Sequence, residues 1–247
     1  MYGLGTLINV VAILVGATIG VLVGHRLPER TRTTVTDALG LVTLVIGGLN
    51  VVALRDQEFV DAVGGAATLL IVLAALLIGG ILGSLLQLEK RLEDVGGWLQ
   101  RKLAPGEVGG TRARFVEGFV DSSLIFCIGP LAVLGALSDG LGQGIDELAL
   151  KATLDGFASI AFAASLGWGV AASALSVGAW QGLLTILAVF VGDVMSDAML
   201  SALTATGGVL LLGVGMRLLN LKSVPVGDML PALIVAPLLT VAVAAVV

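Results

Sequence analysis

Two apolar segments near the middle of the chain carry polar residues whose types and spacing suit the binding of an ion or a polar solute. The first contains an acid, two hydroxyls, a thiol and a helix-breaking pair: Asp121, Ser122, Ser123, Cys127 and Gly129-Pro130. The second, one segment later, holds Asp155, Gly156 and Ser159. An ionisable side chain at membrane depth costs about 2.5–3.5 kcal/mol on insertion scales, so such residues mark functional sites by default. These residues are our candidates for a solute or ion path.

The pair Gly129-Pro130 predicts a break in the helix that carries Asp121. Proline has no amide proton, and its ring clashes with the preceding helical turn. Carbonyl groups freed by such a break are tolerated only against protein or a water-filled cavity. The acid, the hydroxyls and the freed carbonyls together favour a polar site near the middle of the membrane. The alternative is a kinked helix whose Asp121 caps a neighbouring helix or lies at headgroup level.

Asp155 follows Lys151 by four residues, so the two side chains can pair on one helix face. The segment around them is rich in hydroxyls and glycines, and such a thin polar helix can line a path. The alternative is a tightly packed central helix whose hydroxyls bond their own backbone. Asn9 is expected to bridge neighbouring helices, and Asp228 is expected to cap the last helix.

Composition indicates a membrane protein. A soluble domain has about 25% charged residues, whereas this chain has 13% charged and 57% hydrophobic residues. A soluble packing of 247 residues cannot bury so much apolar surface, so lipid must solvate much of it. The lipid bilayer is therefore the first expected partner, followed by a small ion or polar solute.

The sequence gives little support to an enzyme. The pattern Gly-x-Ser-x-Gly is absent, and the single histidine and single cysteine exclude most histidine-based sites and any cysteine cluster for a metal. Aspartyl chemistry needs two acids at the same depth, whereas we expect Asp121 and Asp155 near opposite membrane surfaces. We therefore expect no catalytic residues, no metal, no cofactor and no nucleic-acid partner.

The elements that must position these residues are membrane-spanning helices, each of which needs about 20 mostly apolar residues. Eight segments qualify: 4–25, 36–54, 63–86, 115–138, 152–175, 178–196, 199–218 and 226–246. The sixth and seventh are joined so closely that they can form one bent hairpin. Residues 87–104 carry leucines at helical spacing among charges, which predicts an amphipathic surface helix with Trp98 as its anchor. The predicted fold is an all-α bundle, one transmembrane domain over residues 1–247.

The distribution of charge predicts the orientation. If the eight spans alternate, every lysine and arginine except Arg55 and Lys151 falls on one side of the membrane. The opposite loops hold mainly Asp and Glu. By the positive-inside rule the basic loops are cytoplasmic, which predicts a multi-pass protein of the plasma (inner) membrane with both termini outside.

Glycines at four-residue spacing predict close helix contacts, because small residues let two backbones approach. They are Gly16, Gly20 and Gly24 in the first span and Gly79 and Gly83 in the third. They suit packing within one chain or a subunit interface in a homo-oligomer. Faint similarities between segments 36–54 and 199–218, which would run in opposite directions, suggest an inverted repeat.

Three motifs resemble one family of bacterial membrane proteins. They are Phe119-Val120-Asp121-Ser122-Ser123 through Gly129-Pro130 with Lys151 to Gly156, the start Gly5-Thr6-Leu7-Ile8-Asn9, and Gly227-Asp228-Met229-Leu230-Pro231. The pattern is similar to the domain-of-unknown-function 554 (DUF554) family over nearly the whole chain. Thr153 and Leu131 depart from it, where a serine and a methionine are expected. The resemblance implies a multi-span inner-membrane protein and supplies no activity or functional residues.

Two functions fit these observations. The first is a transporter or channel for an ion or small polar solute, with a site between the fourth and fifth spans. The alternative is a non-transporting scaffold or sensor subunit that acts through the surface helix 87–104.

Overall fold

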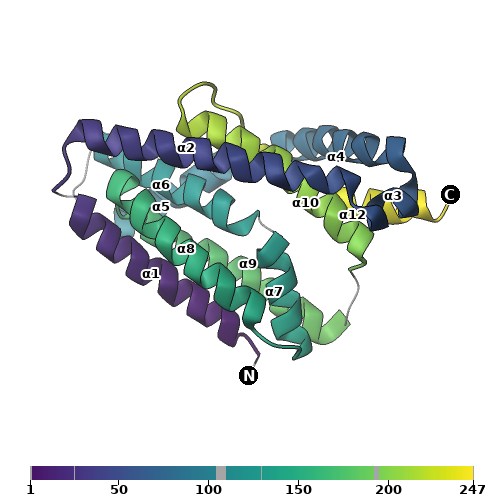
Figure 1. The fold of residues 1–247 in the computed structure, drawn as a ribbon. Coiled ribbons are helices and arrows are strands. Elements are labelled where there is room, and N and C mark those ends of the chain that lie inside the picture. Colours follow the sequence, from purple (N-terminus) through teal and green to yellow (C-terminus); the bar gives the residue numbers. More distant parts are fainter. Residues whose placement is uncertain (1, 25, 104–109, 129, 192–194, 247) are drawn as a thin grey trace. The chain divides into compact units, whose positions relative to one another are not determined.

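The structure is a computed structural model that describes residues 2–24, 26–103, 110–128, 130–191 and 195–246 (Figure 1). Within these residues every regular element is a helix, as predicted. The helices are α1 (Leu4–Gly24), α2 (Glu29–Val51), η1 (Val52–Arg55), α3 (Gln57–Val63), α4 (Gly65–Leu85), α5 (Leu88–Leu103), α6 (Gly110–Cys127), α7 (Pro130–Leu141), α8 (Asp146–Leu166), α9 (Gly169–Val191), α10 (Asp197–Leu218), α11 (Val226–Met229) and α12 (Ala232–Ala244).

Seven helical stretches among the described residues are long and apolar enough to cross a membrane. They are α1, α2 with η1, α4, α8, α9, α10, and α11 with α12. An eighth is the pair α6 and α7, which bend by 62° at a short break. Pro130 begins α7, so the predicted break is present, whereas Gly129 itself lies outside the described residues.

The predicted boundary between the fifth and sixth spans is wrong. The sequence suggested spans at 152–175 and 178–196, but α8 ends at Leu166 and α9 begins at Gly169. Gly167 ends α8 with a positive φ of 79°, a conformation that glycine adopts without strain, and its N–H bonds back to Ala163. Because α8 begins at Asp146, Asp155 lies near its middle rather than one turn from its end.

The chain forms two compact units, and the first comprises Met1–Leu39 and Leu92–Val194. Within it α1 lies alongside α8, as Figure 1 shows. Gly16, Gly20 and Gly24 approach the backbone carbonyls of the α8 residues Gly156, Ile160 and Ala164, in that order. Since the residue numbers increase in the same order along both helices, α1 and α8 run parallel. The glycine face of α1 is thus occupied within the chain.

Helices α6 and α9 of the first unit also run parallel. Gly169, at the start of α9, lies against the Phe115 carbonyl of α6, and Ser123 further along α6 bonds Ser176 further along α9. Parallel pairs of this kind are expected when the first and fifth spans, and the fourth and sixth, point the same way. The parallel orientation of α1 with α8 and of α6 with α9 therefore agrees with eight alternating spans in which α6 and α7 form one broken span.

The second unit comprises Gly40–Arg91 and Met195–Val247. Helix α10 is buried by α12, α3 and α4, and Gly47 of α2 faces Gly208 of α10. On α4, Gly79 and Gly83 lie against the backbone of Ala232 and Asp228, so α4 runs antiparallel to the last span. The predicted glycine pair of this unit, Gly79 and Gly83, therefore contacts a helix of the same chain.

A reciprocal set of contacts joins the start of α5 to the turn before the last span. The Asp228 carboxylate accepts a hydrogen bond from the Glu89 N–H at 2.9 Å, and the Glu89 carboxylate accepts one from the Gly227 N–H at 2.5 Å. Arg217 forms an ion pair with Glu89. Asp228 is thus a cap, but it caps α5 and not its own helix, because the chain fold brings the two helix starts together.

Candidate functional site

A group of buried polar side chains lies between α1, α8 and α9 of the first unit. This polar cluster consists of five residues: Asn9, Lys151, Asp155, Ser159 and Gln181. Asn9, Ser159 and Gln181 are fully buried, and Lys151 and Asp155 retain 5% and 7% exposure. Buried polar groups are costly unless they are bonded, so their contacts decide what the cluster can do.

Asp155 is the centre of the cluster. Its Oδ2 accepts a hydrogen bond from Lys151 Nζ at 2.6 Å and another from Asn9 Nδ2 at 3.0 Å. Lys151 and Asp155 therefore form the ion pair that the four-residue spacing predicted. Asn9 Nδ2 also reaches Gln181 Oε1 at 3.3 Å, so Asn9 bridges three helices, as predicted.

Three atoms of the polar cluster have unused hydrogen-bonding capacity. Asn9 Oδ1, Ser159 Oγ and Gln181 Nε2 are buried and have no hydrogen-bond partner among the described residues. Leaving such an atom unbonded costs about 1–3 kcal/mol. Asn9 Oδ1 is an acceptor, the Gln181 amide is a donor and the Ser159 hydroxyl can be either. The set therefore matches a guest that both donates and accepts hydrogen bonds.

Local sequence explains how the cluster is built. Lys151, Asp155 and Ser159 are spaced by four residues, which places them on one face of α8. A methyl group at Gly16 would collide with the Gly156 carbonyl oxygen and lie 3.1 Å from Ser159 Cβ. The absence of a side chain at Gly16 thus lets α1 approach the polar face of α8.

Asp139 of α7 lies beside the beginning of α1 and holds it in place. It is buried, and its carboxylate accepts hydrogen bonds from the backbone N–H groups of Gly3 at 3.1 Å and Gly5 at 3.0 Å. A carboxylate at a helix N-terminus satisfies free amides and stabilises the positive end of the helix. The fourth span predicted at 115–138 leaves Asp139 in a loop, and no local pattern reveals which helix start it meets.

The acid predicted on α6 lies apart from the polar cluster. Asp121 and Ser122 are fully buried and Ser123 nearly so. Ser122 donates to the Gly118 carbonyl of its own helix, and Ser123 donates to Ser176 of α9 at 3.0 Å. Gly118 lies against Leu166 at the end of α8. Asp121, one turn from Gly118, is therefore nearer the end of α8 than its middle.

The other end of α6 is the part that approaches the polar cluster. Because α6 runs parallel to α9 and Ser123 bonds Ser176, Cys127 at the end of α6 lies beside the stretch of α9 that carries Gln181. The helix break follows directly, since α7 begins at Pro130. Of the residues predicted for the path, Asp155 and Ser159 thus belong to the cluster and Cys127 lies at the end of α6 that approaches it, whereas Ser123 bonds Ser176 of α9 and Ser122 bonds its own helix.

Gln181 is the member of the polar cluster that sequence reasoning missed. It is the only amide in the apolar run from Val177 to Val191, which was the available signal. No group of three or more His, Cys, Asp or Glu side chains within the described ranges is arranged to hold a metal ion. The cavities around Arg114, Leu175 and Gly80 are lined by neither Asp121 nor any member of the polar cluster.

Membrane-length helices around a buried ion pair define the protein as a polytopic helical membrane protein. The chain belongs to the DUF554 family, described as proteins of unknown function, which it matches over residues 4–241. It is 31% identical over 233 residues to the uncharacterized protein YqgA of Escherichia coli (strain K12), with 94% of each chain covered. It is 28% identical over 235 residues to the uncharacterized membrane protein YdfK of Bacillus subtilis (strain 168), with 94% of this chain and 93% of the relative covered. No solved structure matches the chain.

Proposed function

We propose that the protein is a transporter or channel for an ion or small polar solute, and that the polar cluster is its binding site. The observation that carries this proposal is the group of buried atoms with unused hydrogen-bonding capacity on Asn9, Ser159 and Gln181. A purely structural network is stabilising only when every member is bonded. Open donors and acceptors next to an ion pair are instead suited to a polar guest.

The residues of the cluster have different roles in this proposal. Lys151 and Asp155 supply one positive and one negative charge, each of which can turn from its partner to the guest. Asn9 Oδ1, Gln181 Nε2 and Ser159 Oγ supply neutral hydrogen bonds. A bare cation uses only acceptors, so a solute with both donors and acceptors, or an ion that keeps its water, fits this set better.

Transport through the cluster requires a second conformation, because Asn9, Ser159 and Gln181 are fully buried in this one. The bend of 62° between α6 and α7 follows Cys127, at the end of α6 that lies beside the Gln181 stretch of α9. A broken helix of this kind can change its angle without unfolding either half. We propose this break as the hinge, with the stretch around Asp121 and Ser123 as the remainder of the path.

The proposal is tested by flux in vesicles reconstituted with the purified full-length protein. Charge movement on a solid-supported membrane would be recorded for a panel of inorganic ions and zwitterionic amino acids, with an internal pH dye for protons. We expect a solute-dependent signal in the wild type that is lost in Gln181→Leu and Asp155→Ala, and reduced in Asp121→Ala. Glu93→Gln changes an exposed charge on α5 and serves as the matched control. An unchanged signal in both aspartate variants would overturn the assignment.

The scaffold alternative depends on a free apolar face on α5, and the structure gives that face another partner. Leu99 is buried, and Gly96 lies against the Phe119 ring of α6. Val95 and Trp98 remain half exposed, and Lys102 Nζ lies 4.5 Å from the centre of the Trp98 ring. An exposed indole next to a lysine suits the membrane–water interface. We therefore place the function in the polar cluster and treat α5 as an interfacial helix.

A further inference from the structure

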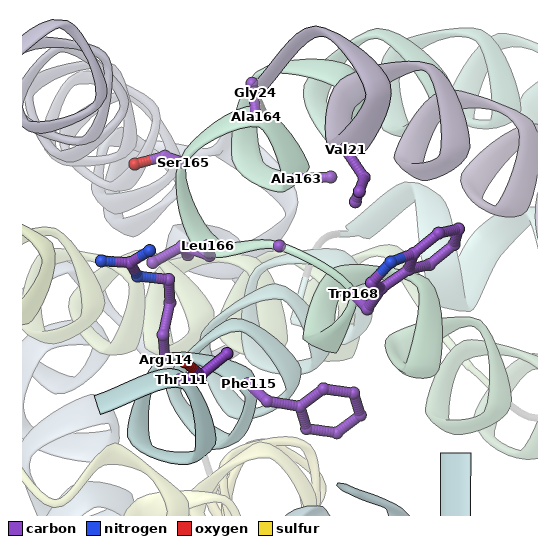
Figure 2. A pocket seen from close by; sticks show the side chains of 11 residues that line it. Val21, Gly24, Thr111, Arg114, Phe115, Ala163, Ala164, Ser165, Leu166 and Trp168 are labelled. Atoms are coloured by element: carbon purple, nitrogen blue, oxygen red, sulfur yellow. The ribbon is translucent and has the colours of Figure 1, made fainter. Parts of the chain in front are cut away.

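Two adjoining cavities of the first unit are distinct from the polar cluster, and they share Phe115 and Trp168 as a common wall. The smaller one, of about 100 Å³, is shown in Figure 2 and has Arg114 and Thr111 among its lining residues. The larger one, of about 500 Å³, has only apolar lining residues. They are Val10, Leu14, Phe115, Trp168, Ala171, Ala172, Ala174 and Leu175. A cavity with a charged side chain in its lining therefore adjoins an apolar cavity.

Arg114 gives the smaller cavity its charge. Its side chain is half buried and forms no ion pair among the residues that the structure describes. Figure 2 shows Arg114 and Phe115 leaving α6 in different directions, with the Trp168 indole on the same side as Phe115. A guanidinium presents five donors in a fork that matches phosphate oxygens. The hydroxyl of Thr111 adds a further donor to the same lining.

The larger cavity has the character of a site for a hydrocarbon chain. Phe115 is buried at its wall, whereas Leu14 and Leu175 are 43% and 58% exposed, on helices long and apolar enough to span a membrane. Gly169 lets α9 pack closely against α6 at this wall, because its backbone lies directly against the Phe115 carbonyl. An apolar cavity bordered by lipid-facing leucines is continuous with the acyl region of a bilayer.

We propose that the two cavities together bind one anionic phospholipid, with its phosphate group at Arg114 and an acyl chain along Phe115 and Trp168. The guanidinium, which has no ion-pair partner among the described residues, selects an anionic headgroup. The adjoining apolar cavity selects a lipid over a free anion. Basic pockets between membrane helices bind anionic headgroups on the same grounds. The site is independent of the polar cluster, so it stands whether or not the protein transports a solute.

The test uses the indole of Trp168 as the reporter in the full-length chain. A Trp98→Phe/Trp180→Phe variant would be reconstituted in phosphatidylcholine vesicles that contain a low fraction of phosphatidylglycerol brominated on its acyl chains. We expect this lipid to quench Trp168 fluorescence more strongly than brominated phosphatidylcholine at the same fraction. One Lys or Arg beside an anionic headgroup contributes about a fivefold preference, so Arg114→Gln is expected to reduce the preference by about that factor.

Arg112→Gln is the matched control, since Arg112 is exposed two residues away and lines neither cavity. Arg112→Gln should keep the preference for brominated phosphatidylglycerol over brominated phosphatidylcholine. Equal quenching of the Arg114 protein by both lipids would overturn the proposal. An unaltered preference in Arg114→Gln would also overturn it. Loss of quenching on adding inorganic phosphate, but not chloride of equal ionic strength, would assign the site to a free anion. If the tryptophan variants fail to fold, native mass spectrometry can replace the fluorescence. It would compare how much phosphatidylglycerol stays bound to the wild-type chain and to Arg114→Gln, both with all three tryptophans.

Discussion

At the scale of single residues, the Asp155 carboxylate has one charged and one neutral hydrogen-bond donor. Lys151 balances its charge at 2.6 Å, and Asn9 donates a neutral hydrogen bond to the same oxygen at 3.0 Å. A buried ion pair is a poor source of stability, because desolvation of both charges offsets their attraction. Keeping the pair in the middle of α8 is therefore better explained by a role in binding than by a role in folding.

This view predicts how stability divides between the two charges. Lys151→Met should lower the free energy of unfolding by about 3–5 kcal/mol, because it leaves a buried carboxylate without its cation. The double variant Lys151→Met/Asp155→Leu should be more stable than Lys151→Met, since neither charge of this pair remains buried without its partner. Denaturant titration in detergent micelles measures both. A double variant less stable than Lys151→Met would show that the pair is needed for folding.

Sequence reasoning succeeded at this scale where partners are close in the chain or chemically restricted. The spacing of Lys151 and Asp155 on one helix allows few other arrangements, and an amide such as Asn9 in an apolar span must find a polar partner. It could not find that Gln181 completes the cluster or that Asp139 holds the start of α1, because both contacts join helices far apart in sequence. The prediction that Asp121 and Asp155 lie near opposite membrane surfaces is wrong for Asp155, which lies in the middle of α8.

At the scale of elements, the glycine series of α1 determines how closely α8 can approach. Gly16, Gly20 and Gly24 each face a carbonyl of α8, so the contact is backbone against backbone. In lipid, such close packing replaces the hydrophobic effect as the source of helix association. The series was predictable from its four-residue spacing, but its partner was not, since a subunit interface produces the same spacing.

Gly16→Ala should therefore destabilise the protein by about 1–3 kcal/mol, the usual cost of overpacking. The added methyl would meet the Gly156 carbonyl and Ser159 Cβ, and backbone cannot move aside cheaply. Gly48→Ala is the matched control, because a methyl there has nothing within 4 Å, and it should change stability by less than about 0.5 kcal/mol. Thermal unfolding in detergent gives the comparison, and equal shifts for both variants would refute the packing account.

Helix ends were the weakest part of the sequence prediction, as α8 and α9 show. A run without charged residues from Ala158 to Val177 hides the turn at Gly167, because glycine is common inside membrane helices as well as at their ends. The fifth span predicted at 152–175 leaves Asp146 and Glu147 in a loop, whereas they form the first turn of α8, where acids are favoured. The shift matters for function, since it moves Asp155 from the edge of its helix to the middle.

At the scale of the whole molecule, the chain fits eight alternating spans. The helix pairs α1–α8 and α6–α9 run parallel and α4 runs antiparallel to the last span, each as alternation requires. The broken helix α6–α7 must count as one crossing for these directions to agree. Composition and charge distribution predict this number of spans, because membrane thickness fixes span length and the alternation of basic and acidic loops favours an even number. The side on which each loop lies stays a prediction.

The predicted orientation can be checked with single cysteines in a Cys127→Ala chain. Glu58→Cys, on the short helix α3, and Lys222→Cys lie in exposed connections between spans that are predicted on opposite sides of the membrane. With a membrane-impermeant maleimide, intact spheroplasts should label residue 58 and inverted membrane vesicles should label residue 222. Labelling of both residues from the same side would contradict the eight-span plan.

The central claim is that something hydrophilic enters the polar cluster, and access to residue 159 tests it most directly. In vesicles that hold the Cys127→Ala chain, Ser159→Cys should react with a small cationic methanethiosulfonate, whereas Ala136→Cys, fully buried on α7, should not. The account predicts that Ser159→Cys reacts and that solutes which support flux slow its reaction. If residue 159 is as inert as residue 136 under every condition that supports flux, the polar cluster is sealed packing and the proposed transport site is wrong.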